Sequence, residues 1–200
     1  MTINGFMNAA QKCREFGVKL IYPSTGILSF DRMNEYARCK KICEDIHLGE
    51  NLNALGLRIF MGYGPGEGHK SHWASPAYLF AREMVAGRRP VIWGDGTQER
   101  DLIFIDDLAE AILTLADEAT EQIIDIGTGK PESFKEMVLT LNMIIKGESL
   151  MPIYIDKPAG YVEKTAADPT TLHKYYKPKT DLRAGLLAIV NELKGGTHAS

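Results

Sequence analysis

Short apolar runs alternate with longer amphipathic stretches along almost the whole chain, and this alternation restricts the fold more than any other feature. The short runs are typical of buried strands, whereas the stretches between them repeat their apolar residues at helical spacing. Strands that alternate with helices form a parallel sheet, so we expect an α/β fold. Strands are expected near residues 18–22, 56–61, 90–93, 102–105, 123–126 and 153–155.

Residues with known preferences for helix ends mark several of the expected helices. Asp31 and Ser133 are expected to cap the helices that follow them, and Asp106 or Asp107 is expected to cap the stretch LAEAILTLADEA. Gly17 is expected to end the first helix. Helices are expected at 3–16, 31–47, 75–86, 108–119, 133–145 and 181–194, with a short one after Asp168-Pro169.

Composition excludes several classes of function. The formal net charge of -3 argues against a protein that holds nucleic acid through its phosphates. No apolar run approaches the roughly 20 residues of a membrane-spanning helix, and the first residues lack the pattern of a signal peptide. The three cysteines are an odd number and fit reduced thiols better than a disulfide framework. We therefore expect a cytoplasmic protein that contacts neither membrane nor nucleic acid.

Tyr36 and Lys40 lie four positions apart on an expected helix, which places a phenol and an ammonium on one face. A free tyrosine has a pKa of about 10, and a nearby cation favours the phenolate, so we expect Lys40 to lower the pKa of Tyr36. The pair is a candidate acid/base centre. The alternative is a surface lysine beside a half-buried tyrosine, because this spacing is common on helices.

Ser24 and Thr25 follow an expected strand shortly before that helix. Hydroxyls at the carboxyl end of a parallel strand face the crevice in which such sheets bind ligands. Thr25 could therefore hydrogen-bond a substrate hydroxyl while Tyr36 removes its proton. The alternative for both residues is an ordinary turn that caps the next element.

The order of these motifs resembles the extended short-chain dehydrogenase/reductases. The strand with Ser/Thr is followed by Tyr-x-x-x-Lys, then by LRIFMGYGPG, and then by VIWGDGTQERDLIFIDDLAEAI. Within that group the chain is most similar to the NAD-dependent nucleotide-sugar epimerases and dehydratases of the UDP-glucose 4-epimerase type. The string GDGTQERDLIFIDDLAEAI is the most specific part, and the resemblance covers about residues 4–194.

The resemblance implies a role for each matching residue. Tyr36 would be the acid/base, Lys40 would hold the nicotinamide ribose, and Thr25 would bind the reacting sugar hydroxyl. Ser24 and Phe60 would line the cofactor. Arg100 would bind the diphosphate of the sugar nucleotide, which suits the planar guanidinium. The substrate side would also include Met61, and Val91 to Trp93 beside the nucleotide base.

Three departures from the family's pattern concern the substrate side. Met61 stands where the family usually has an asparagine, and a thioether cannot donate the hydrogen bonds of an amide. Only ten residues separate Thr25 from Tyr36, fewer than in most relatives. Lys157 lies close to the position of a phosphate-binding arginine, in a loosely matching segment.

The family's opening strand and Gly-rich turn have no counterpart in the sequence. Gly127-Thr128-Gly129 follows a strand but lacks a third glycine and a later acidic residue, so it is not expected to bind a cofactor. We therefore expect the C-terminal part of a Rossmann-type sheet with a small α/β substrate-binding lobe, without the N-terminal cofactor-binding half. The expected boundaries are 1–63 with about 88–126 for the sheet domain, 64–87 and 127–194 for the lobe, and 195–200 for a disordered tail.

The resemblance implies transient oxidation of a hydroxyl on a nucleotide-diphosphate sugar, most simply a UDP-sugar, with NAD or NADP as cofactor. The alternative is a truncated, inactive relative that binds sugar nucleotides or other proteins. We expect a homodimer, or association with a chain that supplies the missing half.

Two other groups of residues have simpler explanations. Cys39, Cys43 and His47 recur on one helix face, but three successive turns span about 12 Å, too far for one zinc ion. We expect no metal site there. His69 and His72 are expected in a solvated loop, although that loop should border the sugar site. The charged run 98–101 could be an exposed turn, but the surrounding string favours a role for Arg100.

Overall fold

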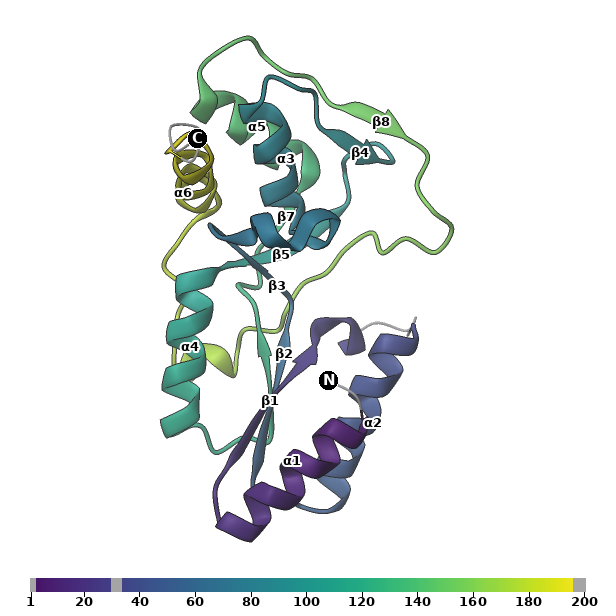
Figure 1. The fold of residues 1–200 in the computed structure, drawn as a ribbon, viewed down its shortest axis with the longest axis vertical. Coiled ribbons are helices and arrows are strands. Elements are labelled where there is room, and N and C mark those ends of the chain that lie inside the picture. Colours follow the sequence, from purple (N-terminus) through teal and green to yellow (C-terminus); the bar gives the residue numbers. More distant parts are fainter. Residues whose placement is uncertain (1–2, 30–33, 196–200) are drawn as a thin grey trace.

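The computed structural model describes residues 3–29 and 34–195. Three parallel strands form its lower sheet in the order β1-β2-β6, with β2 in the middle (Figure 1). Parallel pairing confirms the expected α/β class. The strands are β1 (Leu20–Thr25), β2 (Ala54–Ile59) and β6 (Ile123–Ile126).

Helices cover both faces of this sheet. Helices α1 (Ile3–Phe16) and α2 (Glu35–Gly49) pack together on one side, and α4 (Ile105–Glu118) lies on the other (Figure 1). Apolar side chains fill the space between the sheet and the helices on each face. Phe6, Tyr22 and Cys43 pack under α1 and α2, and a larger cluster around Leu57 and Leu115 packs under α4. A short 3-10 helix, η1 (Gly26–Ser29), follows β1.

A second, crossing group of strands leads into the upper lobe. Strand β3 (Met61–Tyr63) pairs in parallel with β5 (Glu99–Phe104), and β5 pairs antiparallel with β7 (Pro131–Ser133). Because β3 follows β2 almost directly, the chain passes from the lower sheet to the upper lobe at Phe60.

The upper lobe has its own hydrophobic core. Helices α3 (Pro76–Val85), α5 (Phe134–Ile145) and α6 (Leu182–Gly195) pack around Phe80, Met137 and Ile189. A small parallel pair, β4 (Val91–Trp93) with β8 (Ile153–Ile155), projects from this lobe (Figure 1). The remaining short helices are η2 (Glu67–Trp73) and η3 (Leu172–Lys174).

The capping residues expected from the sequence predict one helix start correctly and others wrongly. Ser133 caps α5, as the sequence predicts, and Glu136 completes a capping box with it. The expected cap Asp31 lies outside the described residues, and α2 begins instead after Asn34, whose side chain accepts from the Ala37 amide. Neither Asp106 nor Asp107 caps α4, whose N-cap position is Phe104 without a side-chain hydrogen bond.

Strand β1 extends further than the sequence predicts. It was expected at 18–22 with a turn at Pro23, but it runs to Thr25 and pairs with β2 along its whole length. Proline is tolerated at the edge of a sheet, where its missing N–H breaks no ladder. Among the described residues β1 pairs with β2 alone, so Pro23 occupies such an edge. The extension carries Ser24 and Thr25 to the carboxyl end of the strand.

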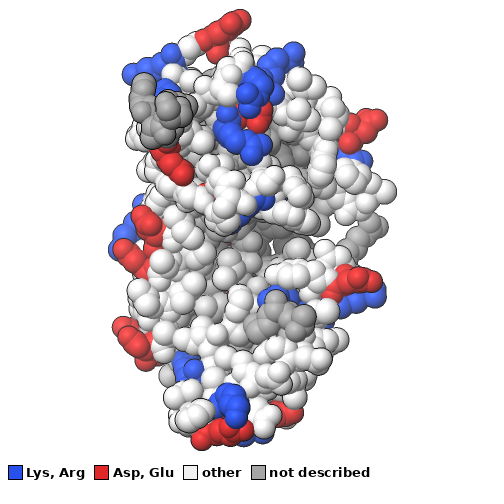
Figure 2. Space-filling view, viewed as in Figure 1, with Lys and Arg blue, Asp and Glu red and all other residues white. Residues whose placement is uncertain are grey.

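Charged side chains gather toward the two ends of the molecule and along both of its side edges (Figure 2). The face between the two lobes is largely uncharged and is hollowed at its centre (Figure 2). In the described part of the chain, no helix has both the length and the apolar character needed to cross a membrane.

Candidate functional site

A pocket of about 320 Å³ lies where the carboxyl ends of β1 and β2 meet the upper lobe. Crevices at this edge of a parallel sheet are the usual ligand sites of such folds. The pocket brings together four residues that the sequence predicted for the site, and six that it did not. Its lining consists of Thr25, Gly26, Ile27, Phe60, Met61, Arg100, Gly160, Tyr161, Val162 and Thr165.

Arg100 is the charged residue of the pocket wall, and it is only 6% exposed. Its guanidinium donates to the backbone carbonyls of Glu99 and Val162, each at 2.7 Å. No carboxylate of the described residues lies within 4.0 Å of it, and burial lowers its pKa. Within the described part of the chain, Arg100 is therefore a buried cation that is hydrogen-bonded but forms no ion pair, although the Glu163 carboxylate acts on it from a greater distance. The alternative of an exposed turn at 98–101 is wrong, since Arg100 lies in β5.

An aromatic wall continues outward from Arg100. Its guanidinium lies 5.1 Å from the ring centroid of Tyr161, and Trp93 meets the same ring edge-to-face with centroids 5.6 Å apart. Trp93 and Val91 remain about half exposed on β4. The rings are nearly perpendicular, so they add apolar surface beside the positive charge, and the face of one ring at a time could stack against a planar ligand.

The floor of the pocket is closed by a tight contact between Gly26 and Phe60. A Cβ atom on Gly26 would lie 2.6 Å from the Phe60 ring, so a side chain at this position would displace the ring. Thr25 is 6% exposed, and its hydroxyl accepts a long hydrogen bond from the Ile27 amide. Met61 lines the same pocket and supplies no donor there, as its side chain predicts.

Tyr36 and Lys40 lie one turn apart on α2, beside this region. The Lys40 Nζ atom is 5.5 Å from the ring centroid of Tyr36 and donates to the Pro23 carbonyl at 2.6 Å. Lys40 is 3% exposed, whereas Tyr36 is 53% exposed. The hydrogen bond to Pro23 fixes α2 against the carboxyl end of β1, and thereby holds the pair near Thr25 in the fold.

The expected lowering of the Tyr36 pKa is wrong for this structure. Partial burial raises the pKa of Tyr36, and burial also lowers the pKa of Lys40. Removing water from around the phenol disfavours the phenolate, and the Lys40 ammonium donates to the Pro23 carbonyl. Tyr36 therefore carries its proton at neutral pH in this state.

A buried charge network beneath the pocket includes a residue that the sequence analysis missed. Glu44, 1% exposed, accepts from Ser24 Oγ at 2.5 Å and from Arg58 Nε and Nη2 at 2.9 and 2.7 Å. The Ser24 hydroxyl is thus directed to Glu44, and Ser24 is itself 4% exposed. Glu44 follows Lys40 by four positions on the same helix face, a spacing that could have identified it.

The donor set of Tyr36 and Lys40 fits the nicotinamide ribose of NAD or NADP. Lys40 uses one hydrogen bond on Pro23 and retains further N–H donors, and the Tyr36 hydroxyl is accessible. The turn Gly127-Thr128-Gly129 does not fit the pyrophosphate. Its amides at Thr128 and Gly129 already donate to the buried carboxylate of Asp101, at 2.7 and 2.9 Å.

The other candidate residues lie outside the pocket. Lys157 pairs with Glu163 and lines a separate hollow beside β4 and β8. His47 is fully buried with its Nδ1 atom 3.1 Å from the Tyr22 hydroxyl. His69 bonds the Gly66 carbonyl, and His72 packs on Trp73. No group of three or more metal-binding side chains is close enough to hold an ion within the described ranges.

A parallel sheet with a ligand-sized pocket at its carboxyl edge, facing a second lobe, defines a Rossmann-like protein. The chain belongs to the NAD dependent epimerase/dehydratase family, whose model matches residues 2–127. It is similar in structure to UDP-N-acetylglucosamine 4-epimerase from Methanobrevibacter ruminantium, in complex with UDP-N-acetylmuramic acid. That match has a TM-score of 0.84 at 22% identity and covers 98% of this chain and 69% of the other.

Two further solved structures show the same fold. UDP-glucose 4-epimerase from Thermotoga maritima, with UDP-glucose, matches with a TM-score of 0.84 at 24% identity, over 96% of this chain and 69% of that one. UDP-glucuronic acid 4-epimerase from Bacillus cereus, in complex with UDP-glucuronic acid and NAD, matches with a TM-score of 0.78 at 22% identity, over 96% and 67%. The predicted membership of a nucleotide-sugar epimerase and dehydratase group is thus confirmed at the level of family and fold.

These matches correct one expectation. The sequence analysis predicted a chain without the family's N-terminal half. The family model, however, matches from residue 2 onward, and the structural match covers 98% of the chain. The N-terminal half of this chain is therefore part of the family's fold, and the expectation of a missing half is withdrawn.

Proposed function

We propose that the chain binds a nucleotide-diphosphate sugar between its lobes and takes part in NAD(P)-dependent epimerase- or dehydratase-type oxidation of one sugar hydroxyl. The observation that carries the proposal is Arg100, a buried guanidinium at the pocket wall that forms no ion pair with any residue the structure describes. A buried cation without an ion pair is costly, and a diphosphate would compensate the charge of Arg100 through paired hydrogen bonds. The adjoining rings of Tyr161 and Trp93 offer a surface for the base.

The chemistry is assigned to the polar groups at the ends of β1 and α2. The Thr25 hydroxyl would hydrogen-bond the reacting sugar hydroxyl, and the Tyr36 hydroxyl would take its proton. Lys40 would hold the ribose of the cofactor while its bond to Pro23 keeps α2 in place. A bound nicotinamide would supply the acceptor for the hydride. The contribution of this chain is to orient these groups and to place donors around the developing charge.

The substitution Arg100→Lys tests the proposed substrate site. A lysine keeps the charge but loses the planar fork, so the affinity for UDP-glucose should fall about 10- to 100-fold. Isothermal titration of UDP-glucose measures the effect, with circular dichroism to verify the fold. The matched control is Arg88→Lys, an exposed arginine paired with Glu83, which should bind as the parent does. An unchanged affinity in folded Arg100→Lys would refute the assignment of the diphosphate to this pocket.

A second candidate function is binding of the sugar nucleotide without turnover. The raised pKa of Tyr36 and the engagement of Lys40 by Pro23 favour it, because both weaken the base that the reaction needs. Under this function UDP-glucose binds through Arg100, while NAD and NADP do not bind and no product forms. Separate titrations of the two ligands distinguish the candidates.

A further inference from the structure

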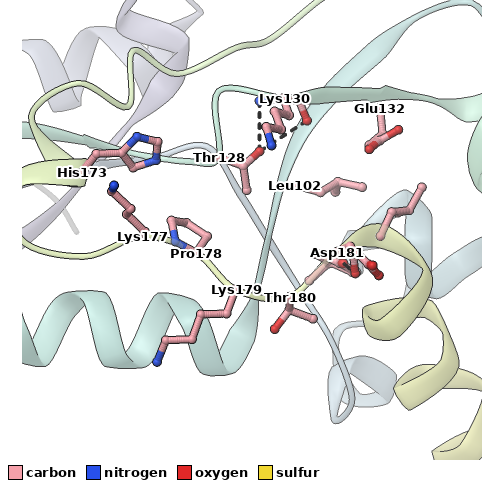
Figure 3. A pocket seen from close by; sticks show the side chains of 12 residues that line it. Leu102, Thr128, Lys130, Glu132, His173, Lys177, Pro178, Lys179, Thr180 and Asp181 are labelled. Carbon is pink, nitrogen blue, oxygen red and sulfur yellow. Dashed lines mark hydrogen bonds between the residues drawn. The ribbon is translucent and has the colours of Figure 1, made fainter.

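A second cavity of about 340 Å³ lies away from the Arg100 pocket, between α4, β7 and the segment that leads into α6 (Figure 3). Its floor is apolar and is formed by Leu102 and Tyr63. The size is within the range of small-molecule sites, roughly 300–1,000 Å³. Its lining residues are Tyr63, Leu102, Thr128, Lys130, Glu132, His173, Lys177, Pro178, Lys179, Thr180, Asp181 and Leu182.

Two buried carboxylates fix the walls of this cavity from behind. Asp101 accepts from the amides of Thr128 and Gly129, and Asp107 accepts from those of Lys179 and Thr180 at 3.1 and 2.8 Å. Asp101 and Asp107 therefore hold the backbone on both sides of the cavity. The charged side chains that face the cavity are not needed for this. A site whose walls are already ordered loses less entropy when it binds a ligand.

The charges that line the cavity are separated along it. His173 and Lys177 lie at one end, with Lys130 between the ends, whereas Glu132 and Asp181 lie at the other (Figure 3). Lys179 points away and pairs with Glu110. By contrast, neither Lys130 nor Lys177 has an ion pair with any described residue.

The acidic end has unused acceptors. Burial raises the pKa of Glu132, and the neighbouring carboxylates Glu136 and Asp181 add to the effect. No hydrogen bond joins the Glu132 carboxylate to a described residue, whereas Asp181 uses Oδ1 to accept from the Ala184 amide. Carboxylate oxygens are acceptors only, so this end would pair with hydroxyl groups of a ligand.

We propose that this cavity is a second ligand site, which takes a phosphorylated sugar or polyol. The phosphate would contact Lys130, Lys177 and His173, since lysine binds phosphate well as a point charge. The hydroxyl groups would donate to Glu132 and Asp181. A molecule of this class can pair with both ends of the cavity. Inorganic phosphate can pair only with the basic end, and a free sugar only with the acidic end.

The test is an NMR titration of the full chain with glucose 1-phosphate, inorganic phosphate and glucose. Glucose 1-phosphate should shift the resonances of residues 128–132 and 173–181 and bind more tightly than either fragment. Lys130→Gln and Lys177→Gln should each weaken it about tenfold, and Glu132→Gln should weaken glucose 1-phosphate but not inorganic phosphate. The control Lys12→Gln, an exposed lysine on α1, should bind as the parent does.

Three outcomes would overturn the proposal. One is the absence of shifts in these segments at millimolar glucose 1-phosphate. Another is shifts confined to the residues of the Arg100 pocket. The third is equal affinity in the parent, Lys130→Gln and Lys177→Gln. The site is independent of the proposed function, because Arg100→Lys should leave its affinity for glucose 1-phosphate unchanged.

Discussion

Tyr36→Phe should abolish nearly all turnover of any sugar nucleotide that the chain accepts. The substitution removes a single oxygen from a half-exposed side chain, so folding and UDP-glucose binding should be retained. Loss of a positioned acid/base typically lowers kcat about 10²- to 10⁴-fold. Chromatography of the sugar-nucleotide products, with NAD present and UDP-glucose saturating, measures the loss.

The pH dependence of the parent gives an independent check on this assignment. Burial raises the pKa of Tyr36, so the phenolate is the minor form at neutral pH. A reaction that needs the phenolate should therefore speed up as the pH rises through the neutral range, by about tenfold per unit at most. The control Tyr175→Phe removes a hydroxyl bound to Glu121, far from the pocket, and should keep the parent's rate and profile. Full turnover by Tyr36→Phe would remove Tyr36 from the mechanism.

Asp101→Asn should cause the largest loss of stability among conservative substitutions in the chain. The fully buried carboxylate accepts four hydrogen bonds, from the Thr128, Gly129 and Ala167 amides and from the Thr128 hydroxyl. An amide cannot accept all four, and its own N–H group would face other donors. We expect the free energy of unfolding to fall by about 3 kcal/mol, because hydrogen bonds to a charged group are the strong ones.

Urea unfolding followed by circular dichroism measures this change. The matched control is Asp117→Asn, an exposed aspartate near the end of α4, which should change stability by less than about 0.5 kcal/mol. A loss as small as the control's would show that the four contacts do not hold the structure together. The Ala167 amide that Asp101 holds lies two residues after Thr165, which lines the pocket. Asp101→Asn should therefore also weaken UDP-glucose binding.

Features that depend on neighbouring residues could be predicted from the sequence. The helix 3–16 rests on the periodicity of its apolar residues, and the Ser133 cap rests on a contact with an amide three positions away. The parallel α/β arrangement follows from the alternation of elements. Strand β1 was misplaced because Pro23 was treated as a turn residue, although the edge of a sheet tolerates it.

The candidate site could be predicted only in part. The family's pattern placed Thr25, Phe60, Met61 and Arg100, and the fold brings these four into one pocket. Tyr161 was missed, because it lies in an irregular segment and reaches Arg100 only through the tertiary fold. The direction of the Tyr36 pKa shift was also wrong, because sequence spacing shows the nearby cation but not the loss of water around the phenol.

The proposed function requires one site on this chain to bind both a sugar nucleotide and a nicotinamide cofactor. The decisive measurement is a pair of separate calorimetric titrations of the parent chain, with UDP-glucose and with NAD or NADP. The proposed oxidoreductase predicts saturable binding of both ligands, with the UDP-glucose affinity lowered in Arg100→Lys. Binding of UDP-glucose alone would support the function without turnover, and binding of neither ligand would contradict the site itself.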